Sequence, residues 1–140
     1  MCSSDLSSIM DRRTWVFIAN RPLSESEEIM VNDVLNDFVL NWKTHGKPLN
    51  AQAFCFEHSA IVIAANESEV QASGCSIDKI YHLVHSLGLT LSVDFFNRFN
   101  VLQIGQDKIW QLTKYHQDIA STCIHANILS LNEFNKKAGT

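Results

Sequence analysis

The side chain best suited to chemistry in this sequence is a cysteine within the run ASGCSID at positions 72–78. Small residues let the backbone bend tightly, and a serine can cap a following helix. Cys75 is therefore expected at or beside a helix N-terminus, where partial positive charge favours a thiolate and also holds anions. One interpretation makes Cys75 a catalytic nucleophile. Another makes the turn a binding site for a small anionic ligand, with candidate residues Ser73, Gly74, Ser76 and Asp78. In the third, the run only shapes a turn.

Other polar side chains that could bind an anion follow predicted elements. Asn20 and Arg21 come after the first predicted strand, His45 comes at the end of the first predicted helix, and Arg98 stands near Phe96. A guanidinium can clamp a carboxylate or phosphate, although an ion pair with a neighbouring acid is the alternative for both arginines. His45 is otherwise a favourable partner for the helix dipole.

A metal site is the less favoured interpretation of one helix face. Cys75, Asp78, His82 and His85 fall within roughly 80° of arc on the second predicted helix. Cys75 and His85 would lie about 15 Å apart along the axis, so one ion cannot touch both. The face is opposite the apolar stripe and is interpreted as solvated surface. We predict no metal and no cofactor.

Composition and missing motifs exclude several classes of function. The chain has 11 basic and 15 acidic residues, a net charge of −4, so it lacks the basic surplus of a nucleic-acid-binding protein. No G-x-x-x-x-G-K-[ST], G-x-G-x-x-G, H-E-x-x-H or G-x-S-x-G motif occurs. An ATPase of the phosphate-loop type is therefore excluded. No apolar run approaches the roughly 20 residues that span a membrane.

The 140 residues suffice for one compact domain. We expect residues 1–13 to form a flexible leader and residues 14–140 a single domain. The opening residues lack a secretory signal, and the four cysteines match no zinc or disulfide pattern. These features predict a cytoplasmic protein with reduced thiols.

The candidate residues must be positioned by alternating strands and helices. The spacing of Ser24 and Glu27 is that of a capping box, and it predicts a helix over 24–44 that ends near Gly46. The remaining patterns predict strands over 15–19, 49–57, 60–65, 99–104 and 108–112, and a helix over 76–87 that ends at Gly88. Residues 113–121 are weakly helical in pattern, and 123–134 favour no single element.

The order strand, helix, strand, strand, helix, strand is typical of the split βαβ arrangement. We therefore predict an α+β fold, specifically a ferredoxin-like two-layer sandwich with an extra C-terminal hairpin and helix. Helices would cover one face of an antiparallel sheet. An unrelated α+β order is the alternative.

The sequence resembles a family of short bacterial proteins of unknown activity. The resemblance rests on residues 20–23, on Trp42 with His45-Gly46, on the ASGCSID run, and on Phe96 with Arg98. Members often carry the label "ABC transporter ATPase", which the missing phosphate loop contradicts here. The resemblance implies that these motif residues form a shared site.

Three hypotheses for function follow. The favoured one is a regulatory or small-ligand-binding domain that self-associates through exposed sheet edges and holds an anion at the turn around Cys75. The second is a thiol-dependent enzyme in which Cys75 is the nucleophile and Arg21, Arg98 or His45 is the base or anion clamp. The third is a structural or partner-binding protein.

Overall fold

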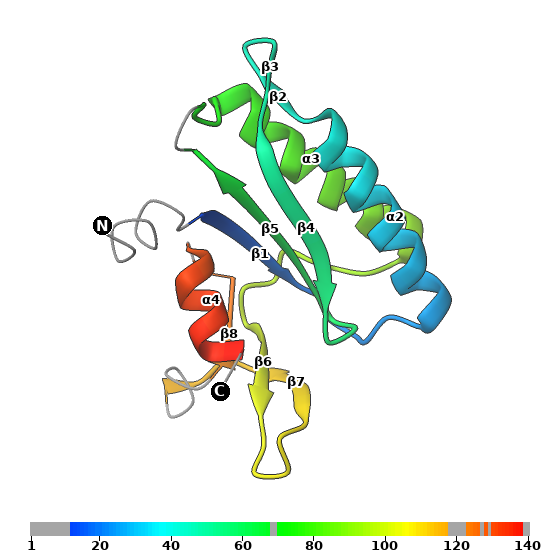
Figure 1. Ribbon diagram of the computed structural model, residues 1–140. Helices are drawn as coiled ribbons and strands as arrows, with labels where there is room; N and C mark the ends of the chain where they lie inside the picture. The colour runs from blue at the N-terminus through cyan, green and yellow to red at the C-terminus, as the bar shows by residue number, and fades with distance from the viewer. Residues whose placement is uncertain (1–11, 68–69, 118–122, 127, 129, 139–140) are drawn as a thin grey trace, which may run out of the picture.

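The computed structural model describes residues 12–67, 70–117, 123–126, 128 and 130–138 (Figure 1). Helices and strands follow one another in these ranges in the order β1 (Arg13–Ile18), α2 (Glu25–Asn41), β2 (Lys43–Thr44), β3 (Lys47–Pro48), β4 (Asn50–Phe56), β5 (Ala60–Asn66), α3 (Gly74–Leu91), β6 (Asn100–Ile104), β7 (Trp110–Lys114), β8 (Cys123–Ile124) and α4 (Leu131–Ala138). The fold is mixed α+β, as predicted.

The main sheet has the strand order β1-β5-β4, and both pairs are antiparallel. β1 and β4 are therefore parallel to one another, with β5 inserted between them and α2 in the connection. This is the split βαβ unit that the element order predicted. The continuous apolar run of β5 fits its central place, since a strand between two others is covered on its faces.

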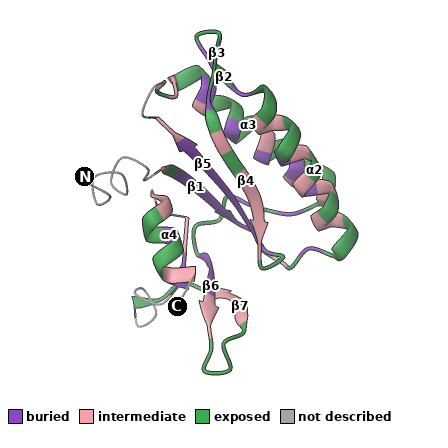
Figure 2. Cartoon of the chain, viewed as in Figure 1, coloured by how far each residue is buried: buried purple, intermediate pink, exposed green. Residues whose placement is uncertain are grey.

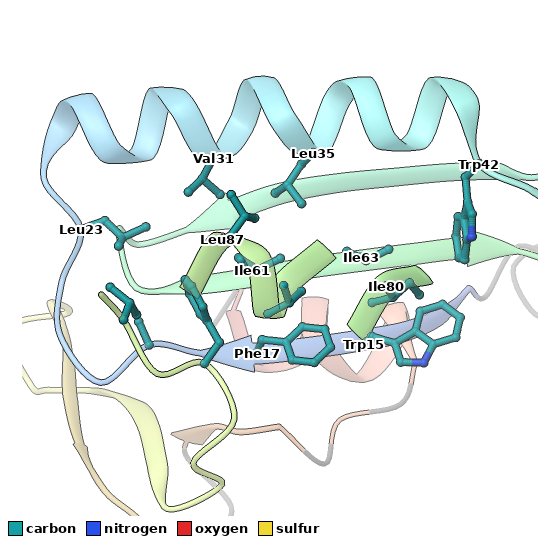
Figure 3. Close-up of a cluster of buried hydrophobic side chains, with 14 of the residues drawn as sticks. Trp15, Phe17, Leu23, Val31, Leu35, Trp42, Ile61, Ile63, Ile80 and Leu87 are labelled. Atoms are coloured by element: carbon teal, nitrogen blue, oxygen red, sulfur yellow. The ribbon is translucent and has the colours of Figure 1, made fainter. Parts of the chain in front are cut away.

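Both faces of this sheet are buried, because alternate residues of β1 and β5 enter two different cores. Phe17, Ile61 and Ile63 belong to a core that α2 and α3 cover. Figure 3 shows Val31 and Leu35 of α2 pointing toward the strands of the sheet. A second core, on the opposite face, brings β1 and β5 against β6, β8 and α4; it contains Val16, Ile18, Val62, Leu102, Ile124 and Phe134.

The second layer explains where the predicted fourth strand lies. β6 pairs with β7 and β8 in a separate three-stranded sheet and does not join the main one. The ferredoxin-like arrangement, which needs a fourth strand beside β1, is therefore not confirmed. The expected two layers become three, because the C-terminal residues cover the sheet face opposite α2 and α3. Figure 2 shows β1 and β5 buried between them.

The first helix begins as predicted and ends early. The Ser24 hydroxyl accepts from the Glu27 N–H, and the Glu27 carboxylate accepts from the Ser24 N–H, which confirms the capping box. The helix ends at Asn41 rather than at position 44. Gly46 belongs instead to the two-residue turn of the β2–β3 hairpin, where His45 and Gly46 have φ values of 50° and 78°. Such values are typical of a tight hairpin turn.

The second helix is longer at both ends than predicted. It starts at Gly74, with Ser73 as its N-cap, and it runs through Gly88 to Leu91. Gly88 lies inside the helix, at a place where the Val93 backbone packs closely against it. A Cβ at this position would lie 2.6 Å from the carbonyl oxygen of Val93, whose N–H donates to the Gly88 carbonyl.

The remaining predictions have mixed outcomes. The hairpin of β6 and β7 is confirmed, with β7 beginning two residues later than predicted. β7 extends to Lys114, so the start of the weakly helical stretch is strand, and 118–121 lie outside the described residues. β1 begins at Arg13, so the last residue of the expected leader belongs to a strand. Residues 1–11 of that leader lie outside the described residues.

We expect Gly88→Ala to destabilise the protein by about 1–3 kcal/mol, since the added methyl group meets backbone that cannot easily move. The matched control is Gly74→Ala in the same helix, where an added Cβ meets nothing within 4 Å. Urea unfolding measures both variants. An equal free energy of unfolding for the two would contradict the packing role of Gly88.

Candidate functional site

The β2–β3 hairpin is tied to the first turn of α3 by two hydrogen bonds. The indole Nε1 of buried Trp42 donates to the Ser76 carbonyl at 2.9 Å. The backbone N–H of Ser73 donates to Thr44 Oγ1 at 3.1 Å. Trp42 also stacks edge-on against Trp15 of β1, with ring centroids 5.9 Å apart. The hairpin tip is thus held beside the start of the helix.

Two serines form some of the hydrogen bonds at the N-terminal end of α3. The Ser76 N–H donates to Ser73 Oγ at 3.1 Å, and the Ser76 hydroxyl donates to the Ser73 carbonyl at 2.8 Å. These hydroxyl groups serve as caps. The backbone N–H groups of Gly74 and Cys75 have no hydrogen-bond acceptor among the described residues. Two donors therefore remain at the positive end of an 18-residue helix.

A cavity of about 470 Å³ lies between the hairpin and this turn. It contains two of the predicted residues, His45 and Ser73, and its lining consists of Thr44, His45, Lys47, Val70, Gln71, Ala72 and Ser73. None of these residues is acidic. The Glu67 carboxylate lies beside the lining, because it accepts from the Ala72 N–H at 2.8 Å, and it is 3.8 Å from the Arg13 guanidinium.

Cys75 is exposed in the first turn of α3, as the sequence predicted from its place beside a helix N-terminus. No described residue forms a hydrogen bond to its thiol. The other described cysteines differ from it. Burial raises the pKa of Cys55 to about 12, with Glu28 adding to the shift, and burial also raises the pKa of Cys123.

Arg21 lies at the other end of α3. Its guanidinium pairs with both carboxylate oxygens of Glu27, at 3.0 and 2.9 Å, and also donates to the Leu91 carbonyl at 2.7 Å. Leu91 is the last residue of α3, so Arg21 and Cys75 are separated by about the full helix, on the order of 25 Å. Arg21 is an ion-paired structural residue, and Asn20 beside it accepts from the Asp94 N–H.

Arg98 occupies a third place, in a cavity along the edge of β1. The structure therefore distributes the predicted site residues over three regions and brings only His45 and the turn of α3 together. Asp78 lies near the turn but beyond its first four residues, because the helix begins two residues earlier than predicted.

The polar face of α3 is solvated, as interpreted from the sequence. Cys75, Asp78, His82 and His85 are all exposed. In the part of the chain that the structure describes, no three or more His, Cys, Asp or Glu residues are placed to hold a metal ion. No helix in the described ranges is long and apolar enough to cross a membrane.

Sequence reasoning missed Thr44 and Lys47, because it assigned residues 43–44 to the helix and Gly46 to its end. The signal was present: His45-Gly46 is a two-residue turn between short polar segments, and Pro48 fits the edge of a sheet. The comparisons with known proteins add no relative, since no family model, curated protein or solved structure matches this chain.

The ion pair of Arg21 predicts a specific pH dependence of stability. Its hydrogen bonds to Glu27 are the main reason that the pKa of this carboxyl is lowered from 4.5 to about 2. A lowered pKa in the folded state stabilises the protein above pH 4.5, and this contribution is lost as the pH falls toward 2. We expect the difference in free energy of unfolding between the wild type and Glu27→Gln to shrink as the pH falls from 4.5 toward 2.

Urea unfolding from about pH 5 to about pH 2 measures this difference across the window in which the contribution is lost. Glutamine keeps an oxygen that can accept from the Ser24 N–H, so the cap is conserved. Glu25→Gln is the control, because it removes a carboxylate from the same helical turn but no bond to Arg21. A difference between wild type and Glu27→Gln that is constant with pH would disprove the assignment.

Cysteine exposure predicts an order of alkylation. At about pH 8 a thiol with a pKa of about 12 is ionised in roughly one molecule in 10,000, so Cys55 reacts slowly with iodoacetamide. We expect Cys75 to be modified well before Cys55 and Cys123, as measured by peptide mass spectrometry over time. The Cys75→Ser variant should leave the rates at Cys55 and Cys123 unchanged. Faster modification of Cys55 would contradict the described burial.

Proposed function

We propose that this protein is a non-enzymatic domain that binds a small oxyanion, such as phosphate or a carboxylate, at the N-terminal turn of α3. The observation that carries the proposal is that backbone N–H groups without an acceptor lie next to a cavity with a lysine in its lining. The first turn of α3 leaves the N–H groups of Gly74 and Cys75 without an acceptor among the described residues, and its N-cap, Ser73, lines a cavity of about 470 Å³ together with His45 and Lys47 of the hairpin.

The electrostatics of this turn favour an anion. A helix N-terminus carries the equivalent of about half a positive charge, and α3 has no acidic residue in its first turn. Lys47 adds a full charge among the lining residues, which include no acid. An oxyanion can accept from two backbone N–H groups while a lysine pairs with its remaining oxygens.

A binding function is favoured over a thiol enzyme. A cysteine nucleophile is activated by an adjacent base or by a helix N-terminus, and no described residue forms a hydrogen bond to the Cys75 thiol, so the helix N-terminus would have to act without a base. The second candidate, a cysteine-dependent enzyme, rests on the exposure of Cys75 at a helix N-terminus. Cys75→Ala should leave anion binding intact under our proposal, because the backbone N–H is retained.

The proposal includes several broader expectations. β4 is an outer strand of the main sheet, with Asn50 and Gln52 exposed, which supports self-association through a sheet edge. The split βαβ order supports kinship with ferredoxin-like folds. The ASGCSID run supports membership in the family that it resembles. A cytoplasmic location, and no nucleic-acid partner, are proposed on the composition.

The test removes one N–H group without disturbing the helix. Proline is tolerated at the first position of a helix, and Ser73, with φ −79° and ψ 166°, already has the conformation that precedes proline. In thermal unfolding with inorganic phosphate, we expect saturable stabilisation of the wild type, about 2.7 kcal/mol at about 100 times Kd. Gly74→Pro should lose most of it, and Gly74→Ala should retain it.

Lysine variants test the charge. Lys47→Gln should weaken phosphate binding about tenfold, whereas Lys43→Gln, in the same hairpin but outside the cavity lining, should not. Absence of stabilisation in the wild type, or an equal response of Gly74→Pro and Gly74→Ala, would refute the proposed site.

A further inference from the structure

β7 forms one edge of the second sheet, whose strand order is β7-β6-β8. Figure 1 shows the hairpin of β6 and β7 extending away from α2 and α3. The ladder of β7 uses only the side toward β6, and no described residue pairs with its other side. An unpaired strand edge is a template for another strand, so the residues along this edge decide what can pair with it.

The register with β6 shows which backbone groups of the edge are open. The Tyr115 N–H donates to the Phe99 carbonyl at 2.7 Å, so the odd-numbered residues of this segment bond to β6. Backbone groups of successive residues point to alternate sides of an antiparallel strand. The N–H and C=O groups of Trp110, Leu112 and Lys114 therefore point outward, and within the described ranges no hydrogen bond reaches them.

Exposed apolar side chains flank the edge symmetrically. Ile109 and Tyr115 stand three residues before and three residues after Leu112, and they are 56% and 41% exposed. If a second copy pairs antiparallel about a two-fold axis at Leu112, Ile109 of each copy lies opposite Tyr115 of the other. Phe99, which is 66% exposed, is the neighbour of Tyr115 on the β6 side. The pairing would thus bring these exposed apolar side chains into one stripe.

The same axis keeps like charges apart. Lys114 is the only charged residue of β7, and the axis places it opposite the uncharged Trp110 of the second copy. The two lysines are then separated by about 14 Å along the strands. Gln111 lies opposite Thr113, which is a neutral polar pair. Every opposed pair along β7 is therefore free of charge repulsion.

The outer strand of the main sheet, β4, is less open than β7. The Cys55 N–H donates to the Asn32 side-chain oxygen at 3.0 Å, so a residue of α2 closes one end of that edge. At the other end, the Leu49 N–H donates to the Trp42 carbonyl at 3.0 Å. A strand pairing along the whole of β4 would have to break both bonds, whereas pairing along β7 breaks no bond of the described residues.

We infer that β7 pairs with β7 of a second copy of this chain, antiparallel and about a two-fold axis at Leu112. The two three-stranded sheets then join into one sheet of six strands. Two backbone hydrogen bonds form at each of the three opposed pairs that Trp110, Leu112 and Lys114 make. The inference names the edge and the partner for the self-association expected under the proposed function, and it does not depend on the oxyanion site.

Sedimentation velocity of the full chain, from about 5 to about 500 µM, measures the association. An interface of two short strands is small, so we expect a monomer–dimer equilibrium with a Kd on the order of 10 µM. Ile109→Asp and Tyr115→Lys should each weaken it about 100-fold, because each substitution affects two symmetric contacts worth about tenfold each. Ile29→Asp, at a 57% exposed position of α2, is the matched control and should leave the Kd unchanged.

Mixing the two variants tests the register. In a heterodimer of Ile109→Asp with Tyr115→Lys, one contact joins the two introduced opposite charges, and the other joins the native isoleucine and tyrosine. The mixture should therefore dimerise within about tenfold of the wild-type Kd, although neither variant does so alone. A wild type that stays monomeric at about 500 µM would overturn the inference, and that measurement needs no variant. A dimer that both variants leave intact, or a mixture that stays monomeric, would overturn it as well.

The outcome is separable from that of the proposed function, because β7 shares no residue with the cavity beside α3. A monomeric wild type that phosphate still stabilises overturns this inference alone. A dimer that responds to the β7 variants but is not stabilised by phosphate supports the inference and overturns only the oxyanion site.

Discussion

The structure depends on the burial of one sheet on both of its faces. β1 and β5 supply apolar residues without polar alternation, so neither face of these strands can be left to water. Covering the first face uses α2 and α3. Covering the second uses β6, β8 and α4, with Leu102, Ile124 and Phe134 at the contact. β6 is thereby committed to the second layer, where it pairs with β7 and β8 and not with β1.

The same constraint fixes the ends of α3. The helix must cross the sheet, and its 18 residues place its first turn and its last turn on opposite sides of the molecule. Trp42 and Thr44 tie the hairpin to the first turn, whereas Arg21 is bonded at the last. Cys75 and Arg21, which the sequence suggested for one site, are therefore separated by the length of α3. The first turn lies beside the hairpin, and the last turn is bonded to an ion-paired arginine.

The sequence correctly predicted the features that depend on residues close together in the chain. The capping box of Ser24 and Glu27, the strand over 60–65 and the helix N-terminus at Cys75 all recur in the structure. The errors involve contacts that the pattern within one helix or strand does not show. Gly88 resembles a helix end in sequence, but the approach of the Val93 backbone, five residues later, explains it. The placement of β6 depends on α4 and β8, and the sequence pattern of that region predicted no element. For Arg21 the alternative of an ion pair with a neighbouring acid is the correct one, although spacing alone does not single out Glu27.

The N-terminal ends of α2 and α3 differ in whether acidic side chains balance the positive end of the helix dipole. In α2 the cap uses a glutamate, and Glu25, Glu27 and Glu28 already supply negative charge to the helix dipole. In α3 the N-cap N–H of Ser73 donates to the neutral hydroxyl of Thr44, the Ser76 hydroxyl donates to the Ser73 carbonyl, and the first turn has no acid. Neutral hydroxyl groups thus cap this helix without adding a negative charge to its dipole. The chain thus leaves positive potential at the N-terminal end of α3, next to the hairpin of His45 and Lys47, and this difference between the two helices is the physical basis of the proposed oxyanion site.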